Sequence, residues 1–181
     1  MPEEIMWSKF FDPEQILQQM EVGNDLQSVV DLGSGFGTFS IPASEMIKGE
    51  VHAFDIDLDM ILQLQTKIDQ LDIKNINLHL KDFIAEGISL PDNSVDYVML
   101  FNILHHDNPH QILNDVFRVL KTGEKAGIIH WRSDIPTPRG PHLDFRPTPD
   151  ECKKWAVESG FTITKELNLK PYHFGIVIAK L

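Results

Sequence analysis

Closely spaced glycines give the first indication of chemistry in this sequence. They lie in the segment Asp31-Leu-Gly-Ser-Gly-Phe-Gly37, directly after a short apolar run. Glycine tolerates positive φ angles and has no side chain, so the backbone can approach a ligand closely. A dinucleotide fingerprint needs G-x-G-x-x-G, and Thr38 occupies the place of its third glycine. The loop therefore predicts a ligand site, but not the usual pyrophosphate site of NAD enzymes.

Two acids and a pair of histidines follow other apolar runs. Asp55 and Asp82 each come directly after such a run, and His105 and His106 follow Val95–Phe101. Because an unperturbed histidine titrates near pH ~6.5, either imidazole can take a proton from a hydroxyl or an amine. The alternative is that one of them packs against or caps the next helix.

A metal site is a weaker hypothesis for the same segment. His105, His106, Asp107 and His110 are close in sequence. If His106 and His110 lie on one helix, they share a face with ligand-like spacing. The only cysteine is Cys152, so neither a disulfide within the chain nor a thiolate cluster can form. We expect no metal.

The elements that must position these residues alternate between strand-like and helix-like segments. Apolar runs predict strands at 28–32, 51–54, 75–80, 95–101 and 125–131. Apolar residues at three- and four-residue steps predict helices at 38–47, 58–71, 112–120 and 151–159. Two last strands, 161–167 and 173–179, have a link too short for a crossover helix and must pair as a hairpin. The pattern predicts an α/β fold: a Rossmann-like doubly wound sheet of about seven strands, mostly parallel with an antiparallel C-terminal hairpin.

One domain over residues 1–181 accommodates these elements. Residues 1–27 precede the first strand and predict a short helical extension that includes Phe10 and Phe11. Residues 135–149 hold five prolines and a glycine and predict a long loop. Ligands of open α/β sheets lie beyond the carboxyl ends of the strands. We therefore expect this loop, which follows the fifth strand, to close over a ligand; the alternative is an inert surface loop.

Composition and sequence pattern argue against a nucleic-acid partner, a membrane span and secretion. The net charge of −11 argues against binding nucleic acid, which requires clustered lysine and arginine. No apolar run approaches the ~20 residues of a membrane span. The N-terminus lacks the basic start and apolar run of a signal peptide. We expect a cytoplasmic protein with no nucleic-acid partner.

Taken in order, the motifs resemble those of class I S-adenosylmethionine-dependent methyltransferases, in the methyltransferase domain 11 branch that includes ubiquinone and menaquinone biosynthesis enzymes. Asp31–Gly37 looks like motif I, and Val51–Asp55 looks like motif II. Further matches follow in the family's order at Lys81–Phe83, Leu90–Val98, Asn102–His106 and Val119–Gly123. Thr122 departs from the pattern by replacing the usual proline.

The resemblance implies S-adenosylmethionine as the cofactor. The residues that it assigns to the cofactor are Asp31, Gly33, Ser34, Gly35, Gly37, Asp55, Ile56, Asp82, Phe83 and Asn102. In the family the glycine loop wraps the methionyl part, and the acid matching Asp55 accepts both ribose hydroxyls. Ile56 would lie against the adenine, and Asp82 would take its amino proton. Two alternative structural roles stay open. Asp82 can be a turn or cap residue, and Asp31 can accept hydrogen bonds from the backbone of its own loop instead of binding the cofactor's ammonium group.

The expected function is in-line methyl transfer from S-adenosylmethionine to a small-molecule acceptor, with His105 and His106 as candidate catalytic residues. Alignment and exclusion of water carry such a reaction, so a dedicated base is optional. The alternative is a protein that binds S-adenosylmethionine without turnover of its own, or a subunit whose acceptor site a partner completes. A homodimer is one such assembly.

Overall fold

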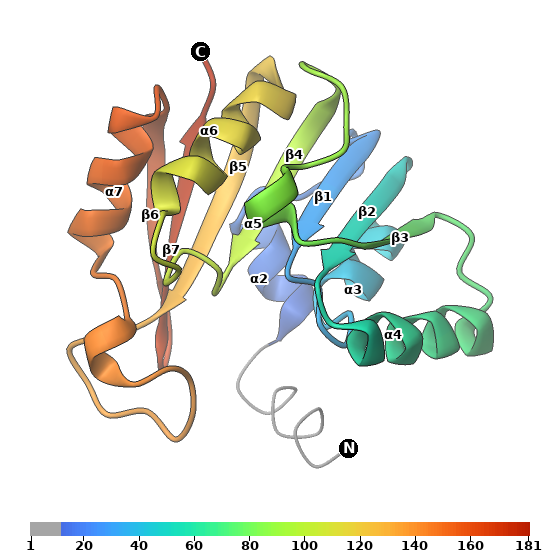
Figure 1. Cartoon of the computed structure of the whole chain (residues 1–181), viewed down its shortest axis with the longest axis horizontal. Coiled ribbons are helices and arrows are strands. Elements are labelled where there is room, and N and C mark those ends of the chain that lie inside the picture. Colours follow the sequence, from blue (N-terminus) through green and yellow to red (C-terminus); the bar gives the residue numbers. More distant parts are fainter. Residues whose placement is uncertain (1–11) are drawn as a thin grey trace.

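The computed structural model describes residues 12–181, so the expected roles of Phe10 and Phe11 lie outside the described residues. A seven-stranded sheet runs through the molecule in the order β3-β2-β1-β4-β5-β7-β6 (Figure 1). Its strands are β1 Ser28–Leu32, β2 Glu50–Asp55, β3 Ile76–Leu80, β4 Val95–Phe101, β5 Leu120–Trp131, β6 Thr162–Leu169 and β7 His173–Ala179. The described helices are α2 Pro13–Gln19, α3 Ser40–Met46, α4 Leu58–Leu71, α5 Phe83–Glu86, α6 Pro109–Val119, η1 Leu143–Phe145 and α7 Pro149–Glu158.

The sheet is parallel from β3 to β5, and β7 lies antiparallel between β5 and β6. The strand order reverses between β1 and β4, which opens a crevice at their carboxyl ends, where ligands of this architecture bind. The predicted fold class is therefore confirmed, including the C-terminal hairpin.

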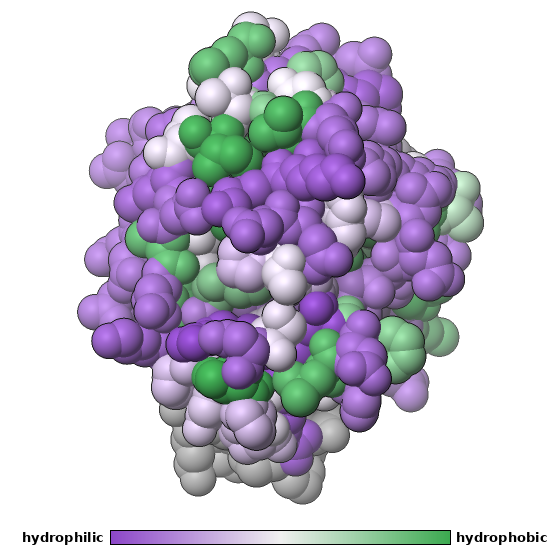
Figure 2. All heavy atoms as spheres, turned by 90° about the vertical axis from the view of Figure 1, so that its left-hand side faces the viewer, coloured by the Kyte–Doolittle hydropathy of each residue, from purple (hydrophilic) through white to green (hydrophobic). Residues whose placement is uncertain are grey.

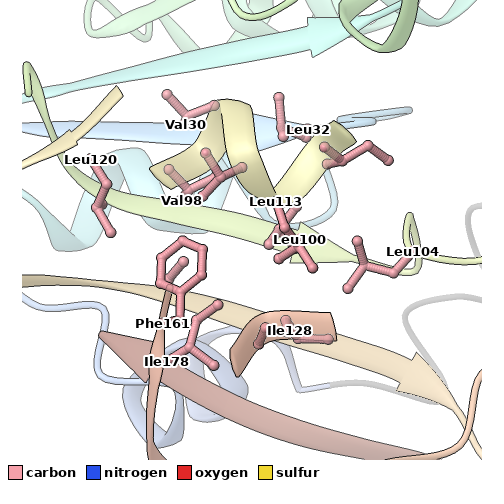
Figure 3. Close-up of a cluster of buried hydrophobic side chains, with 14 of the residues drawn as sticks. Val30, Leu32, Val98, Leu100, Leu104, Leu113, Leu120, Ile128, Phe161 and Ile178 are labelled. Carbon is pink, nitrogen blue, oxygen red and sulfur yellow. The ribbon is translucent and has the colours of Figure 1, made fainter. Parts of the chain in front are cut away.

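Three apolar clusters hold the helices against the two faces of the sheet, the smallest of them (Ala53, Leu64 and Ile68) beneath α4. One cluster lies on the face covered by α6 and α7, and Figure 3 shows Leu100, Leu113 and Ile128 within it. A second cluster lies on the face covered by α2 and α3, which Figure 1 places behind the sheet. All seven residues of β4 are buried, because this strand sits between the first two clusters. The switch point is therefore bordered by a strand that is buried on both faces.

The structure corrects two local predictions. Helix α6 ends at Val119 and β5 begins at Leu120, earlier than predicted, because Leu120 already pairs with Val95 of β4. Helix α6 begins at Pro109, with the side chain of Asn108 as its N-terminal cap. His106 therefore precedes the helix, and the prediction that it shares a helix face with His110 is wrong.

The outer face formed by α7 and β6 is mostly hydrophilic, with scattered apolar side chains (Figure 2). Strand β6 is an edge strand on which Glu166 is exposed and Lys165 is half-buried. Charged side chains on an edge strand discourage pairing with other chains. None of the described helices is long and apolar enough to cross a membrane.

Candidate functional site

Two adjoining cavities lie at the carboxyl ends of β1, β2 and β4, and both are lined by Gly33 and Ile103. The loop cavity, about 260 Å³, is bounded by the glycine loop, Phe101 and Asn102. The acid cavity, about 470 Å³, is lined by Asp55, Asp82 and neighbouring apolar residues. The strand ends thus bring together residues that are far apart in sequence.

The glycine loop is held in place by the end of β2. The backbone N–H groups of Gly33 and Ser34 both donate to the carbonyl of Phe54, at 2.9 and 3.0 Å. Gly33, Gly35 and Gly37 have φ angles of 77°, 51° and 80°, which other residues rarely adopt. A Cβ atom added to Gly35 would meet nothing within 4 Å, whereas one on Gly37 would overlap Leu64. Gly35 therefore faces open space at the loop cavity, and Gly37 allows α4 to pack closely.

Asp55 joins the loop to the acid cavity. Its Oδ2 accepts the N–H of Gly35 at 2.8 Å, and its Oδ1 accepts the N–H of Asp57 at 2.9 Å. The side chain is nearly buried, yet it lines the acid cavity. Since each carboxylate oxygen has two lone pairs, both oxygens can still accept a hydroxyl of a bound ligand.

Asp31 is buried at the end of β1 and lines the loop cavity. Its Oδ2 accepts the hydroxyl of Ser40, the first residue of α3, at 2.5 Å. Burial raises the pKa of Asp31 to about 6; the bond from Ser40 opposes the rise and the charge of Asp55 adds to it. A cationic group in the loop cavity would relieve this repulsion between two acids.

Asp82 caps α5, as the plainer hypothesis has it. Its Oδ1 accepts the N–H groups of Ile84 and Ala85 at 3.1 and 3.0 Å. The same side chain lines the acid cavity together with Ile56 and Phe83. Capping through one oxygen leaves the other for a ligand, so the two roles are compatible.

Two polar atoms of the loop cavity lack protein partners. Ser34 Oγ and Asn102 Oδ1 are buried, and neither has a hydrogen-bond partner among residues 12–181. Asn102 is held in the left-handed region at φ 58°, while its N–H donates to the carbonyl of Ile129 at 2.7 Å. Leaving such atoms unpaired costs about 1–3 kcal/mol each. Their position suits a polar ligand.

The two candidate catalytic histidines are stacked, with ring centroids 4.9 Å apart, but they have different surroundings. His106 is exposed and lines the acid cavity. His105 is half-buried, and its Nδ1 atom is buried without a partner among the described residues. Burial lowers the pKa of His105, the neighbouring His106 lowers it further, and a backbone interaction with Asn102 opposes both. His105 is therefore neutral at pH 7.

Gln111 also lines the acid cavity, and no sequence pattern pointed to it. It lies in the first turns of α6, borders the acid cavity, and donates from Nε2 to the carbonyl of Ile84 at 2.5 Å. Ile84 and Ala85 of α5 also line this cavity. A one-turn helix leaves no periodic signal, so neither α5 nor its contact with α6 could be read from the sequence.

Within the described chain, no three histidine, cysteine or acidic side chains are arranged to hold a metal ion. His110 instead contacts Glu158 of α7 at 2.9 Å.

The proline-rich loop is tied to the end of β5 by Arg146. Its guanidinium donates to the carbonyls of Pro141, Arg132 and Arg139 at 2.7, 3.0 and 3.1 Å. It also lies over the Trp131 ring, 5.7 Å from the centroid. The residues that line the two cavities come from outside this loop. Its expected closure over a ligand thus stays a prediction.

The donor set fits S-adenosylmethionine. Asp55 has lone pairs for the ribose hydroxyls, and Ile56 and Phe83 provide apolar surface beside the base. Ser34 and Asn102 offer unpaired oxygens near Asp31, where a cationic methionyl group would be favoured.

Comparisons with known proteins agree with this site. The family model for a methyltransferase domain matches residues 29–123. No curated protein sequence matches the chain significantly. The structure of a SAM-dependent methyltransferase from Aquifex aeolicus is similar with a TM-score of 0.86 and 26% identity, covering 95% of this chain and 91% of that one. A protein from Sulfolobus solfataricus assigned to the type 11 methyltransferases is similar with a TM-score of 0.69 and 27% identity, over 99% and 92% of the two chains.

A [4+2]-cyclase, SpnF, shares the fold with a TM-score of 0.79 at 10% identity, over 92% of this chain and 80% of that one. That likeness concerns the fold alone, whereas the family match spans the glycine loop, Asp55 and Asp82. The chain therefore belongs to the methyltransferase domain family and is a class I S-adenosylmethionine-dependent methyltransferase.

Proposed function

We propose that this enzyme methylates a neutral small molecule bearing a hydroxyl or amine, by in-line displacement, and that His105 takes the acceptor's proton. The observation that carries the proposal is the charge of the site. Among residues 12–181, Asp31, Asp55 and Asp82 line the two cavities, and no lysine or arginine does so. An acidic site favours a cationic cofactor and disfavours a carboxylate or phosphate on the acceptor.

The acid cavity would hold the nucleoside part of the cofactor. Asp55 binds the ribose hydroxyls while it keeps the N–H of Gly35 in place. Asp82 accepts from the adenine amino group, and Ile56 covers one face of the base. His106 and Gln111 complete this cavity, so we assign His106 to cofactor binding rather than to proton transfer.

The loop cavity would hold the methionyl part and border the acceptor. S-adenosylmethionine, when bound, supplies an activated methyl group there. Asp31 balances the positive charge, and Ser34 and Asn102 donate or accept hydrogen bonds. Phe39 and Phe101 meet edge to face, with centroids 4.7 Å apart, and form an apolar wall that excludes water. These residues align and shield the reaction rather than take part in it.

His105 would act as the base. Its lowered pKa leaves the imidazole unprotonated at neutral pH, which is the state that accepts a proton. The preceding Leu104 is fully buried in the core, which fixes the backbone that carries His105 (Figure 3). A fixed base needs no reorganisation before it receives the proton.

A labelled-methyl assay tests this function. The protein is incubated with methyl-labelled S-adenosylmethionine and pools of alcohols and phenols, amines, carboxylates, phosphates or RNA. We expect label only in the neutral hydroxyl or amine pools, with transfer reduced at least ~100-fold by His105→Gln. Transfer confined to anionic pools would contradict the proposal. Binding of the cofactor without any methyl transfer would also contradict it, and would favour the alternative that a partner chain completes the acceptor site.

A further inference from the structure

A second, fully buried histidine lies behind His105. His130 is the penultimate residue of β5 and has no exposed surface. Its ring meets the ring of His105 edge to face, with centroids 5.6 Å apart and an interplanar angle of 77°. The ring of Phe174, on β7, stacks with the ring of His130, with centroids 6.4 Å apart. His130 is thus held between the candidate base and the core.

Three ring nitrogens in this pair are buried without protein partners. They are Nδ1 of His105 and both nitrogens of His130, as judged over residues 12–181. A neutral imidazole has one N–H donor and one acceptor nitrogen, and leaving either unpaired in the interior is costly. The structure forms no hydrogen bond between the two rings, but at this centroid separation one nitrogen of each comes within hydrogen-bonding reach when the rings turn toward each other. One such bond would pair Nδ1 of His105 with one nitrogen of His130 and leave the second nitrogen of His130 without a partner among residues 12–181.

A histidine base is normally oriented through the nitrogen that does not react. The hydrogen bond at that nitrogen decides which tautomer is present and which nitrogen is free to accept a proton. We propose that His130 is a positioning residue for His105: it accepts a hydrogen bond from Nδ1–H of His105, so that Nε2 of His105 receives the acceptor's proton. This inference rests on the proposed role of His105 as the base.

The charge of His130 suits this role. Burial lowers its pKa to about 3, and the neighbouring His105, His173 and Arg146 lower it further, whereas a backbone interaction with Trp131 opposes them. His106 is the other titratable group beside His105. A carboxylate at the position of His130 would raise the pKa of His105. A neutral imidazole orients His105 and leaves it unprotonated.

The tautomer of His105 can be observed directly. Two-bond nitrogen–proton NMR spectra of the labelled full-length protein are recorded with and without S-adenosylhomocysteine, and His105→Gln assigns the signal. We expect His105 to carry its proton on Nδ1. His130→Phe keeps a ring against Phe174 but removes the acceptor, and should move the proton of His105 mainly to Nε2. His130→Gln restores an acceptor and should return it to Nδ1.

His106→Phe is the matched control, since this ring also contacts His105 but lines the acid cavity. It should leave the His105 proton on Nδ1. With an acceptor identified, His130→Phe should lower kcat about 10-fold or more at unchanged acceptor KM, and His130→Gln should recover part of it.

An Nε2–H tautomer in the unmodified protein would overturn the proposal, even if His130→Phe fails to fold. A proton that stays on Nδ1 in folded His130→Phe would overturn it as well. Full transfer activity in His105→Gln would instead refute the proposed role of His105 as the base. The spectra would then still decide whether His130 accepts a hydrogen bond from His105.

Discussion

Asp55 offers the sharpest test of the cofactor site, because its contacts divide into those inside the protein and those open to a ligand. Within the protein it accepts two backbone N–H groups, from Gly35 and Asp57. Its remaining lone pairs border the acid cavity. Asp55→Ala removes both sets of contacts. The loss of the ligand contacts changes Kd for the cofactor product, and the loss of the internal contacts changes Tm.

The expected magnitude follows from these contacts. A hydrogen bond to a charged group contributes about 1.5–3 kcal/mol. Loss of the ribose contacts should therefore weaken binding of S-adenosylhomocysteine by about 10- to 150-fold in Kd. Loss of the bonds from Gly35 and Asp57 acts on the free and the bound protein alike, so it should lower Tm without adding to the change in Kd.

Isothermal titration calorimetry with S-adenosylhomocysteine measures the first effect, and thermal unfolding of the free protein measures the second. Asp57→Ala is the matched control, because this exposed acid caps α4 through a bond from Asp59 and lines neither cavity. It should lower stability by about 1 kcal/mol and leave Kd unchanged. A folded Asp55→Ala protein whose Kd stays within a factor of about two would refute the assignment, because every hydrogen-bond estimate exceeds that factor.

Three further predictions concern other parts of the site. Gly37→Ala should lower the free energy of unfolding by about 1–3 kcal/mol in urea titrations, since its φ is positive and its Cβ would overlap Leu64; unchanged stability would contradict this packing role. Because the folded pKa of Asp31 is raised from 3.8 to about 6, stability should fall as pH rises through this window and stay reduced above it. Asp31→Asn should flatten that part of the curve, by about 3 kcal/mol at most, and parallel curves for the two proteins would argue against the raised pKa. Arg146→Met should lower the free energy of unfolding by about 2 kcal/mol or more and speed tryptic cleavage after Arg139. The control Arg132→Gln breaks an exposed ion pair with Asp134 and should change stability by only about 0–1 kcal/mol. Equal effects of the two substitutions would mean that Arg146 does not fasten the loop.

The sequence was sufficient for the sheet but not for the shape of its crevice. Buried strands such as β4 carry continuous apolar runs, and the link between β6 and β7 is too short for anything except a hairpin. Those features depend only on local periodicity and chain length. The order of the strands in the sheet was not predicted, because periodicity identifies strands but does not say which of them pair.

The directions of side chains in turns could not be predicted in the same way. His105 and His106 are neighbours in sequence, yet one faces the interior and the other borders the acid cavity. Both lie in the turn between Asn102, whose backbone is left-handed, and the start of α6 at Pro109. His130 gave no signal at all, because a single histidine in an apolar strand resembles any other polar interruption.

The three acids show why structural and functional roles coincide in this site. Asp31 accepts from the first residue of α3, Asp55 accepts from the glycine loop, and Asp82 caps α5. Asp55 and Asp82 stand where a strand ends and the chain turns, and they accept backbone N–H groups of those turns, whereas Asp31, near the end of β1, accepts a side-chain hydroxyl. The same strand ends form the rim of the crevice. A carboxylate that holds the backbone at a strand end therefore also borders the ligand site. Its lone pairs that are not used within the protein can bind the ligand, so no further residue is needed for that contact.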